Sequence, residues 1–233
     1  MTVAILQARM SSTRLPGKVM KLLAGRPMVD RQLERLRRCT TLLRIVVATS
    51  TDASDDPLAK HLESQGVDVF RGSLNDVLGR YVGAARAFGA TGQVVRLTAD
   101  CPLTDPGVID DCVRLHARTG ADYVSNGREP TYPHGLDVEA FGMDVLEAAA
   151  REARDPYERE HVTPFIYRRP ERFTLGALTQ AKDESHLRWT VDTPEDFAFV
   201  ERVYAALYPT KPDFTSDDVR ALPFSHYGPD GGV

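Results

Sequence analysis

The sequence has few cysteines and no long apolar run. Its 233 residues include three cysteines, and no stretch approaches the roughly 18 apolar residues of a membrane-spanning helix. No basic segment followed by an apolar one resembles a secretion signal. Cys39, Cys101 and Cys112 lack the C-x-x-C spacing of a zinc site and are odd in number. We therefore expect a soluble, cytoplasmic protein with buried thiols and no membrane partner.

Positive charge is not in excess either. Lysine and arginine number 29 against 33 acidic residues, which gives a net charge of −4. A general nucleic-acid-binding protein normally carries a basic face, so we expect no nucleic-acid partner. Arginines do cluster between residues 31 and 38, but Val29, Leu33 and Leu36 recur there with helical period. We interpret the cluster as the solvent-exposed face of a helix.

The first half of the chain alternates between two kinds of segment. Apolar runs at residues 3–6, 45–48, 67–70 and 94–97 are typical of buried strands, and segments of helical period separate them. This alternation predicts a single α/β domain over residues 1–225, with a predominantly parallel sheet flanked by helices. Such a sheet places its ligand at the carboxyl ends of the strands.

Two helices in this half have recognisable ends. Asn75 is placed to cap one helix, and Gly89 is placed to end it. Asp105 and Pro106 begin another helix, which Gly120 ends.

The second half is less regular, because prolines and glycines interrupt the pattern from residue 126 onward. We interpret residues 126–168 as an inserted arm and residues 226–233 as a disordered tail. The elements expected in this half are strands at 136–140, 173–178 and 187–191, and helices at 143–153 and 194–207.

A polar loop directly follows the first apolar run. Backbone N–H groups and hydroxyls in such a loop can bind an anion, and cations supply the counter-charge. We interpret Arg9, Arg14 and Lys18 as a clamp on a triphosphate, although a solvated basic loop is the alternative. The loop has neither the P-loop spacing nor G-x-G-x-x-G. The residues expected to contact nucleotide here are Gln7, Ala8, Arg9, Ser11, Ser12 and Lys18.

Two aspartates stand where predicted strands end. Asp100 follows the run at 94–97, and Asp192 follows the run at 187–191. Carboxylates at this edge of a sheet can hold Mg²⁺ together with phosphate oxygens. Alternatively, Asp100 is a turn residue, and the residues after Asp192 are explained as a helix start capped by Thr193.

The polar loop also carries a longer pattern. Arg9, Ser12, Arg14, Pro16 and Lys18 spell R-x-x-S-x-R-x-P-x-K. This pattern resembles the signature of the acylneuraminate and ketodeoxyoctulosonate cytidylyltransferases, which make CMP-linked sugars, and most of all their SpsF-like branch. The resemblance implies a Rossmann-like nucleotide-diphospho-sugar transferase domain of the GT-A-like type.

Two later segments are similar to family elements in the same order. Asp100, Pro102 and Leu103 match a D-x-P-L element, and the string V-D-T-P-E-D beginning at Val191 matches another. The resemblance implies that Asp100 and Asp192 are the metal ligands. The family usually has glycine before the first of these aspartates, where this chain has Ala99.

The remaining site residues follow from weaker similarities. The segment 71–78 is similar to the branch's R-G-S-x-x-D-V-L element, and 132–139 and 159–164 resemble its acceptor-side elements. The residues expected near the nucleotide are Thr49, Arg71, Ser73, Thr98 and Asp100, and those expected near the acceptor are His134, Asp137, Glu139 and His161.

Together these observations predict a cytidylyltransferase. It would transfer CMP from CTP to an acidic sugar or to a phosphorylated or phosphonate acceptor, with Mg²⁺ as cofactor and pyrophosphate as product. A glycosyltransferase of related fold and a catalytically silent nucleotide-binding subunit are the alternatives. Relatives resembling this chain are usually homodimers, so we expect a homodimer. The residues expected to carry catalysis are Arg9, Arg14, Lys18, Asp100 and Asp192.

Overall fold

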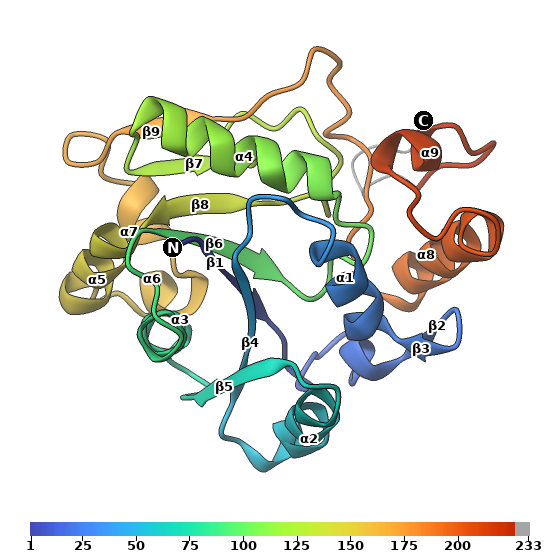
Figure 1. Cartoon of the computed structure of the whole chain (residues 1–233), viewed down its shortest axis with the longest axis horizontal. Helices are drawn as coiled ribbons and strands as arrows, with labels where there is room; N and C mark the ends of the chain where they lie inside the picture. Colours follow the sequence, from blue (N-terminus) through green and yellow to red (C-terminus); the bar gives the residue numbers. More distant parts are fainter. Residues whose placement is uncertain (227–233) are drawn as a thin grey trace.

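The four apolar runs of the first half form the parallel part of one sheet (Figure 1). Strands β1 (Val3–Gln7), β4 (Arg44–Ser50), β5 (Asp68–Gly72) and β6 (Gln93–Thr98) lie in the order β5-β4-β1-β6 and pair in parallel. The computed structural model describes residues 1–226. The chain leaves β1 toward β4 on one side and returns to β6 on the other. Ligands of such sheets bind where this switch occurs, at the carboxyl ends of β1 and β6.

The second half extends the same sheet. Strand β8 (Glu139–Gly142) pairs antiparallel with both β6 and β7 (Tyr123–Ser125), and β9 (Leu175–Ala177) pairs in parallel with β7. The predicted mixed, predominantly parallel α/β sheet is therefore confirmed. Strand β8, which falls within the segment 126–168 interpreted as an inserted arm, lies inside the central sheet between β6 and β7.

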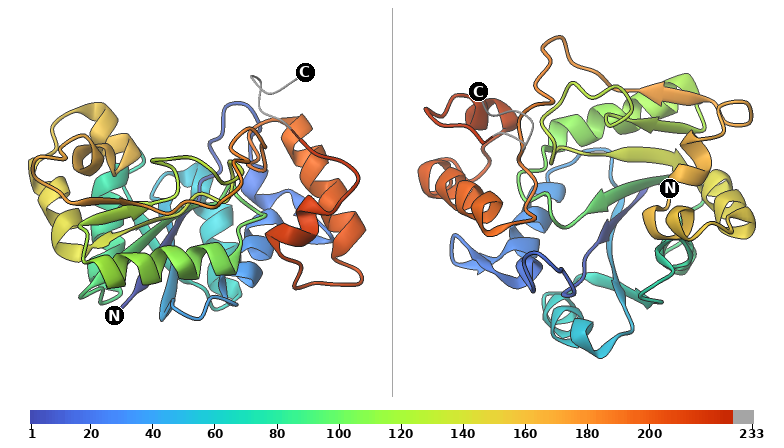
Figure 2. Two further views of the ribbon diagram at one scale, coloured as in Figure 1. Left: turned by 90° about the horizontal axis from the view of Figure 1, so that it is seen from above. Right: turned by 180° about the vertical axis from the view of Figure 1, so that it is seen from behind.

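Helices lie on both faces of the sheet (Figure 2), and alternate residues of a strand face opposite layers. In β1, Val3 and Ile5 belong to one buried apolar cluster, and Ala4 and Leu6 belong to the other. Helices α3 (Val77–Ala87), α5 (Met143–Glu152) and α7 (Pro164–Tyr167) contribute to the first cluster, whereas α1 (Met28–Leu36), α2 (Asp56–Ser64), α4 (Pro106–Thr119), α8 (Pro194–Leu207) and α9 (Ser216–Arg220) contribute to the second.

Short elements complete the described chain. They are the 3-10 helices η1 (Lys18–Met20) and η2 (Ala53–Asp55), the hairpin strands β2 (Leu22–Leu23) and β3 (Arg26–Pro27), and helix α6 (Pro156–His161). No helix within residues 1–226 is long and apolar enough to cross a bilayer. The three cysteines are free thiols.

The predicted helix ends are confirmed for α4. For α3 the predicted end is confirmed, because Gly89 follows the last turn with a φ of 71°, whereas the predicted start is wrong by one residue. Asp105 caps α4, and Gly120 ends it with a φ of 64°. Asp76 caps α3 in place of Asn75, because its carboxylate accepts a hydrogen bond from the N–H of Gly79 at 2.9 Å.

Two predicted strands differ from those observed. Residues 136–138 form no ladder, because the side chain of Asn126 binds their backbone: it donates to the carbonyl of Leu136 at 2.8 Å and accepts from Val138 at 2.9 Å. The predicted strand at 187–191 is wrong: no strand forms there, and an isolated bridge joins Arg188 to His134.

The interpretation of the arginine cluster as a solvated face is wrong for Arg31 and Arg35, whereas Arg37, just after α1, is exposed. Arg31 and Arg35 are 5% and 2% exposed. Arg31 donates to the carbonyl of Leu23 at 3.0 Å, and Arg35 donates to that of Thr104 at 2.6 Å. Burial lowers the pKa of Arg35. The guanidinium group of Arg31 stacks on Tyr208, and that of Arg35 stacks on Phe214. These aromatic side chains are far away in the sequence, so the pattern of α1 could not reveal the contacts.

The expected tail begins with an ordered residue. The ring of His226 lies 2.8 Å from the carboxylate of Asp196 and stacks on Phe199. The rest of that tail, residues 227–233, lies outside the described residues.

Asp110 offers a test of how α4 is joined to the sheet. Its carboxylate accepts hydrogen bonds from the backbone and hydroxyl groups of both Thr40 and Thr41 at 2.6 to 3.1 Å. Burial alone would raise its pKa, but these bonds outweigh burial, and the pKa lies below its ordinary value. We expect Asp110→Asn to lower the free energy of unfolding by about 2 kcal/mol at neutral pH in urea titrations.

The loss of stability caused by Asp110→Asn should become smaller as the pH falls. A lowered carboxyl pKa stabilises the fold fully above the unfolded pKa of about 3.9, and this stabilisation is lost as the pH falls through the folded value. The difference between wild type and variant should therefore shrink below about pH 4. Asp111→Asn, on the exposed side of α4, is the control. A difference that grows in acid would contradict this role.

Candidate active site

The loop after β1 is closed by its own backbone. The carbonyl of Met10 accepts hydrogen bonds from Ser12 at 2.9 Å and from Gly17 at 3.0 Å. Gly17 has a φ of 67°, a left-handed conformation that glycine adopts without strain, and η1 begins directly after it. This turn carries Lys18 back to the carboxyl end of β1.

A buried carboxylate fixes the loop to β4. Asp55 is fully buried and accepts hydrogen bonds from the N–H of Met10 at 2.7 Å and from the N–H of Ser50 at 3.1 Å. The sequence analysis did not single out Asp55, because no pattern links residue 55 to the loop.

The side chain of Lys18 joins the loop to both predicted aspartates. Its Nζ lies 3.0 Å from Asp192, 3.4 Å from Asp100 and 2.7 Å from the carbonyl oxygen of Val191. The Lys18 side chain is only 11% exposed. The structure therefore brings the loop and the two distant aspartates together, although Asp192 follows an extended segment and not a strand of the sheet.

Asp192 is surrounded by positive charge. Besides Lys18, it pairs with Arg14 at 3.1 Å and with Arg188 at 2.8 Å. Partial burial would raise its pKa, but the contacts with these cations outweigh burial and hold the pKa below its ordinary value. Arg188 also pairs with Asp196 at 2.9 Å, and the sequence analysis missed it. Its position four residues before Asp192 and eight residues before Asp196 was the available signal.

The backbone sets the distance between the two aspartates. The carbonyl of Asp100 accepts hydrogen bonds from the N–H of Val191 at 2.7 Å and from the hydroxyl of Thr190 at 3.2 Å. These bonds pin the turn after β6 to the segment that precedes α8. Both carboxylates consequently face the same opening.

A small cavity, the loop cavity, lies between this carboxylate pair and the loop. It measures about 210 Å³. Arg9 lines it and makes no ion pair within residues 1–226, whereas Arg14 and Lys18 are paired with the aspartates. Its lining consists of Gln7, Ala8, Arg9, Ser12, Thr13, Arg14, Lys18, Val19, Thr98, Ala99, Asp100 and Asp192.

Some predicted nucleotide contacts do not line the loop cavity. Ser11 is exposed beside it, and Thr49 is fully buried in β4. Arg71 donates to the carbonyl of Ser50 at 2.8 Å and pairs with Asp56, so it joins β5 to the end of β4. Ser73 lines a separate space, described next.

A second space, the helix cavity, opens at the start of α3. It measures about 430 Å³, and Arg9 lines it as well as the loop cavity. Asp76 and Arg159 form a bidentate pair across it, with distances of 2.6 and 2.9 Å. The lining residues are Arg9, Ser73, Leu74, Asn75, Asp76, Val77, Arg154, Pro156, Arg159 and Glu160. Arg159 therefore faces this space, not the acceptor side to which its segment was assigned.

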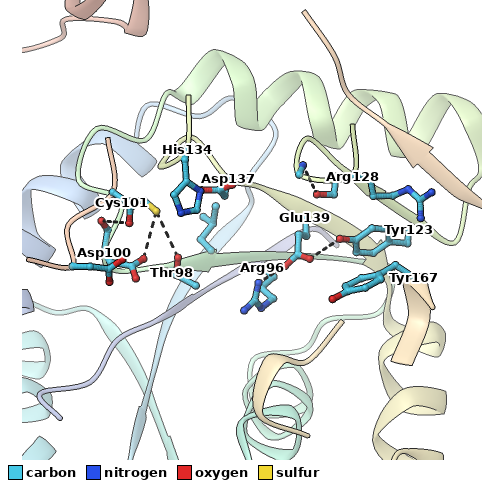
Figure 3. A pocket seen from close by; sticks show the side chains of 15 residues that line it. Arg96, Thr98, Asp100, Cys101, Tyr123, Arg128, His134, Asp137, Glu139 and Tyr167 are labelled. Carbon is cyan, nitrogen blue, oxygen red and sulfur yellow. Dashed lines mark hydrogen bonds and ion pairs between the residues drawn. The ribbon is translucent and has the colours of Figure 1, made fainter. Parts of the chain in front are cut away.

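A third space, the sheet cavity, lies on the other side of the carboxylate pair (Figure 3). It measures about 620 Å³. In Figure 3, Asp100 lies at one end, and Tyr123, Tyr167 and Arg128 lie at the other. The sheet cavity and the loop cavity share Thr98, Asp100 and Asp192. A molecule in either cavity would therefore face the other across the two aspartates.

Glu139 lies within the sheet cavity wall. Its carboxylate pairs with Arg96 and accepts hydrogen bonds from the hydroxyls of Tyr123 at 2.5 Å and Thr163 at 2.7 Å. The sequence analysis named Glu139 and missed its partners. Arg96, a charge inside an otherwise apolar strand, was a usable signal, since unpaired charges are rarely buried.

A tight turn at residues 133–137 supplies two further predicted residues. Asp137 accepts a hydrogen bond from Gly135 at 2.7 Å and lies 3.1 Å from Nδ1 of His134. Backbone bonds join His134 to Leu187 at 2.9 Å and to Trp189 at 2.6 Å. The turn is thereby fixed to the segment that leads to Asp192.

His161 is not brought to the sheet cavity. It ends α6, is exposed, and its ring packs against Tyr157 with a centroid separation of 4.3 Å. The break after it comes from Val162, whose φ of 73° separates α6 from α7.

Asp100 and Asp192 are the carboxylates that could hold a metal ion at this opening. In the part of the chain that the structure describes, no cluster of three or more histidine, cysteine, aspartate or glutamate side chains could hold a metal. Mg²⁺ is commonly held by one or two carboxylates plus substrate phosphates. The two carboxylates that meet at one ammonium group suit that arrangement.

The strand order, the cationic loop and the shared aspartates are those of a nucleotidyltransferase. A model of the cytidylyltransferase family matches residues 3–213. The chain is 32% identical to the spore coat polysaccharide biosynthesis protein SpsF of Bacillus subtilis, over 94% of this chain and 92% of that protein. A solved cytidylyltransferase from Leptospira borgpetersenii superposes with a TM-score of 0.88 at 33% identity, covering 94% of this chain and 92% of that one.

A third relative matches part of the chain. The 3-deoxy-manno-octulosonate cytidylyltransferase of Geobacter sulfurreducens is 36% identical over 112 residues, which are 47% of this chain and 43% of that protein. Together the comparisons confirm the resemblance read from the loop and the two aspartate segments. The chain belongs to the cytidylyltransferase family, and it is a nucleotidyltransferase.

Gly135 tests the contact between the turn and the Asp192 segment. Its φ is 113°, and an added Cβ would lie 2.5 Å from the backbone of Trp189 and Thr190. We expect Gly135→Ala to lower the free energy of unfolding by about 2 to 3 kcal/mol in urea titrations, because overpacking and backbone strain act together. Gly127→Ala is the control, since its Cβ would meet only Ser125 at 3.4 Å. Equal stability of both variants would show that the contact relaxes freely.

Proposed function

We propose that the chain transfers CMP from CTP to an acidic sugar or to a phosphorylated or phosphonate acceptor, and releases pyrophosphate in a Mg²⁺-dependent reaction. The observation that carries this proposal is the pair of cavities that share Thr98, Asp100 and Asp192. A triphosphate in the loop cavity and an acceptor in the sheet cavity would meet at these residues. The family membership of the chain supports CTP as the donor.

The loop supplies most of the charge needed for this transfer. An oxygen of the acceptor attacks the α-phosphorus, the bond to the β-phosphate breaks, and pyrophosphate leaves with the bonding electrons. Arg9, Arg14 and Lys18 are placed to bind phosphate oxygens and to stabilise the departing pyrophosphate. Catalysis in this scheme depends mainly on positioning and electrostatics.

Asp100 and Asp192 are the residues that would hold the metal. When bound, Mg²⁺ would neutralise the charge that develops on the phosphate oxygens. Lys18 would then exchange part of its contact with the two carboxylates for contact with phosphate.

The helix cavity is the proposed place of the base. It adjoins the loop cavity at Arg9 and contains Ser73, which the sequence analysis expected near the nucleotide. The pairing of Asp76 with Arg159 encloses this space from the side of α6.

Further properties follow as parts of this proposal. The name of the Bacillus subtilis relative supports a role in polysaccharide biosynthesis. A homodimer is expected from the family resemblance, and sedimentation analysis would test it. A cytoplasmic location is expected from the unpaired cysteines.

The experiment that tests the function is an assay of pyrophosphate release. Purified protein is incubated with CTP and Mg²⁺ and a panel of sugar acids, sugar phosphates and phosphonates. Release that depends on an acceptor, with a matching CMP adduct, supports the proposal. CTP binding without turnover on any acceptor would favour a silent subunit, and cleavage of a preformed nucleotide sugar would favour a glycosyltransferase.

Asp100→Asn should separate binding from chemistry. The change removes one of two carboxylates at the boundary of the cavities, so we expect kcat to fall on the order of 10²- to 10³-fold. Some affinity for CTP should remain, because the loop cations are unchanged. Steady-state kinetics and calorimetric titration measure the two quantities, with Asp111→Asn as the control. Undiminished turnover would remove Asp100 from the metal site.

Lys18→Ala should discriminate between nucleotides of different charge. Lys18 is placed to bind phosphates, so its loss should weaken CTP binding by about 10- to 100-fold and CMP binding less. Calorimetric titration with both nucleotides measures this ratio. Lys21→Ala, an exposed lysine just beyond η1, is the matched control. An equal loss for CTP and CMP would argue against a triphosphate clamp.

A further inference from the structure

The turn at residues 133–137 places a histidine and an aspartate side by side in the sheet cavity. Nδ1 of His134 lies 3.1 Å from Oδ2 of Asp137, and both residues line the cavity. Figure 3 shows the His134 ring projecting into the cavity between Asp100 and Glu139. A histidine oriented by a carboxylate is a common arrangement for proton transfer.

The contact with Asp137 determines which nitrogen of His134 is available. An ionised carboxylate only accepts hydrogen bonds, so Nδ1 must carry the hydrogen that joins the two groups. In the neutral ring, the lone pair then resides on Nε2. Asp137 is less available to accept a proton from an acceptor, because its Oδ2 already accepts the N–H of Gly135 at 2.7 Å as well as that of His134.

Backbone hydrogen bonds fix the position of His134 relative to Asp100 and Asp192, the two candidate metal ligands. His134 exchanges hydrogen bonds with Leu187 and Trp189, and Val191 in the same segment binds the carbonyl of Asp100. Gly135 packs directly on the backbone of Trp189 and Thr190. The imidazole therefore has a fixed position relative to Asp100 and Asp192, on the acceptor side of both.

Other titratable groups in this cavity are less suited to accept a proton. Glu139 is held by Arg96, Tyr123 and Thr163 in the wall. Burial raises the pKa of Tyr123 and that of Tyr167, so both hydroxyls are protonated at neutral pH. Asp100 and Asp192 are bound to Lys18.

We propose that His134 is the general base of the transfer, and that the acceptor attacks through a hydroxyl group. This inference rests on the proposed function. The hydroxyl gives its proton to Nε2 of His134 as its oxygen forms a bond to the α-phosphorus of CTP, and pyrophosphate leaves. His134 then releases the proton to water. An acceptor that attacks through an ionised phosphate or phosphonate oxygen would need no such base.

The groups around His134 shift its pKa in a defined direction. The hydrogen bond that His134 donates to Asp137 raises the pKa of His134, and partial burial lowers it. The charge of Asp137 raises this pKa as well, that of Arg188 lowers it and that of Asp100 raises it, with a net rise. Because the base must be unprotonated, kcat should increase with pH through this pKa. Asp137→Asn should move that rise to lower pH.

The first test compares acceptor classes and His134 variants. Pyrophosphate release from CTP is measured with hydroxyl acceptors, of which 3-deoxy-manno-octulosonate is the first, and with sugar phosphates and phosphonates. His134→Asn keeps a donor for Asp137 and lacks the base, so kcat with the hydroxyl acceptor should fall by about 10²- to 10⁴-fold. The Kd for CTP should be unchanged. His134→Gln serves as a second variant, and His186→Gln, an exposed histidine outside this cavity, is the control.

Each outcome decides the inference. Loss of kcat in both folded variants with unchanged CTP affinity, together with loss of the acid limb of the pH profile, supports it. Full kcat in the variants, or turnover with ionised phosphate acceptors alone, overturns it and leaves the cytidylyltransferase intact. Absence of acceptor-dependent pyrophosphate release from the wild type overturns the proposed function, and this inference with it.

Discussion

The ammonium group of Lys18 lies among groups that would otherwise repel one another. Two carboxylates and a carbonyl oxygen face it at 2.7 to 3.4 Å, in a place where the lysine is largely removed from water. Bringing two carboxylates to one site without a cation is costly, because each raises the energy of the other. A buried lysine is equally costly without anions. The loop after β1, the end of β6 and the segment before α8 therefore depend on one another.

Backbone contacts make this mutual dependence rigid. The segment 187–192 belongs to no extended ladder, yet it binds the turn at residues 133–137 on one side and the carbonyl of Asp100 on the other. Gly135 permits this approach because it has no Cβ. Residues from three distant parts of the sequence thus reach one opening without a shared element of secondary structure. The positions of His134, Asp100 and Asp192 are consequently set by main-chain geometry.

The sequence was most informative where physical constraints are local or shared by all parallel sheets. Strand ends meet at one edge, so the convergence of Lys18 and Asp100 could be predicted from their places after apolar runs. Asp192 reaches the same place from a segment that is not a strand of the sheet, so its predicted strand was wrong although its position was right. Contacts between residues far apart in the chain could not be predicted. Asn126 binds the backbone that was expected to form a strand, and Asp55 anchors a loop some 45 positions away. The burial of Arg35 likewise depends on Phe214.

The sheet has a parallel region and an antiparallel region, and each region lines different cavities. The parallel strands β5, β4, β1 and β6 carry the loop and helix cavities at their carboxyl ends, whereas β7 and β8 carry the far wall of the sheet cavity through Tyr123 and Glu139. The two regions touch at β6 and at the aspartate pair. Substitutions in the antiparallel region can therefore reshape the far wall of the sheet cavity while the loop cavity keeps its walls. Under the proposed function, a lineage built on this architecture can change its acceptor and retain the residues that bind the nucleotide.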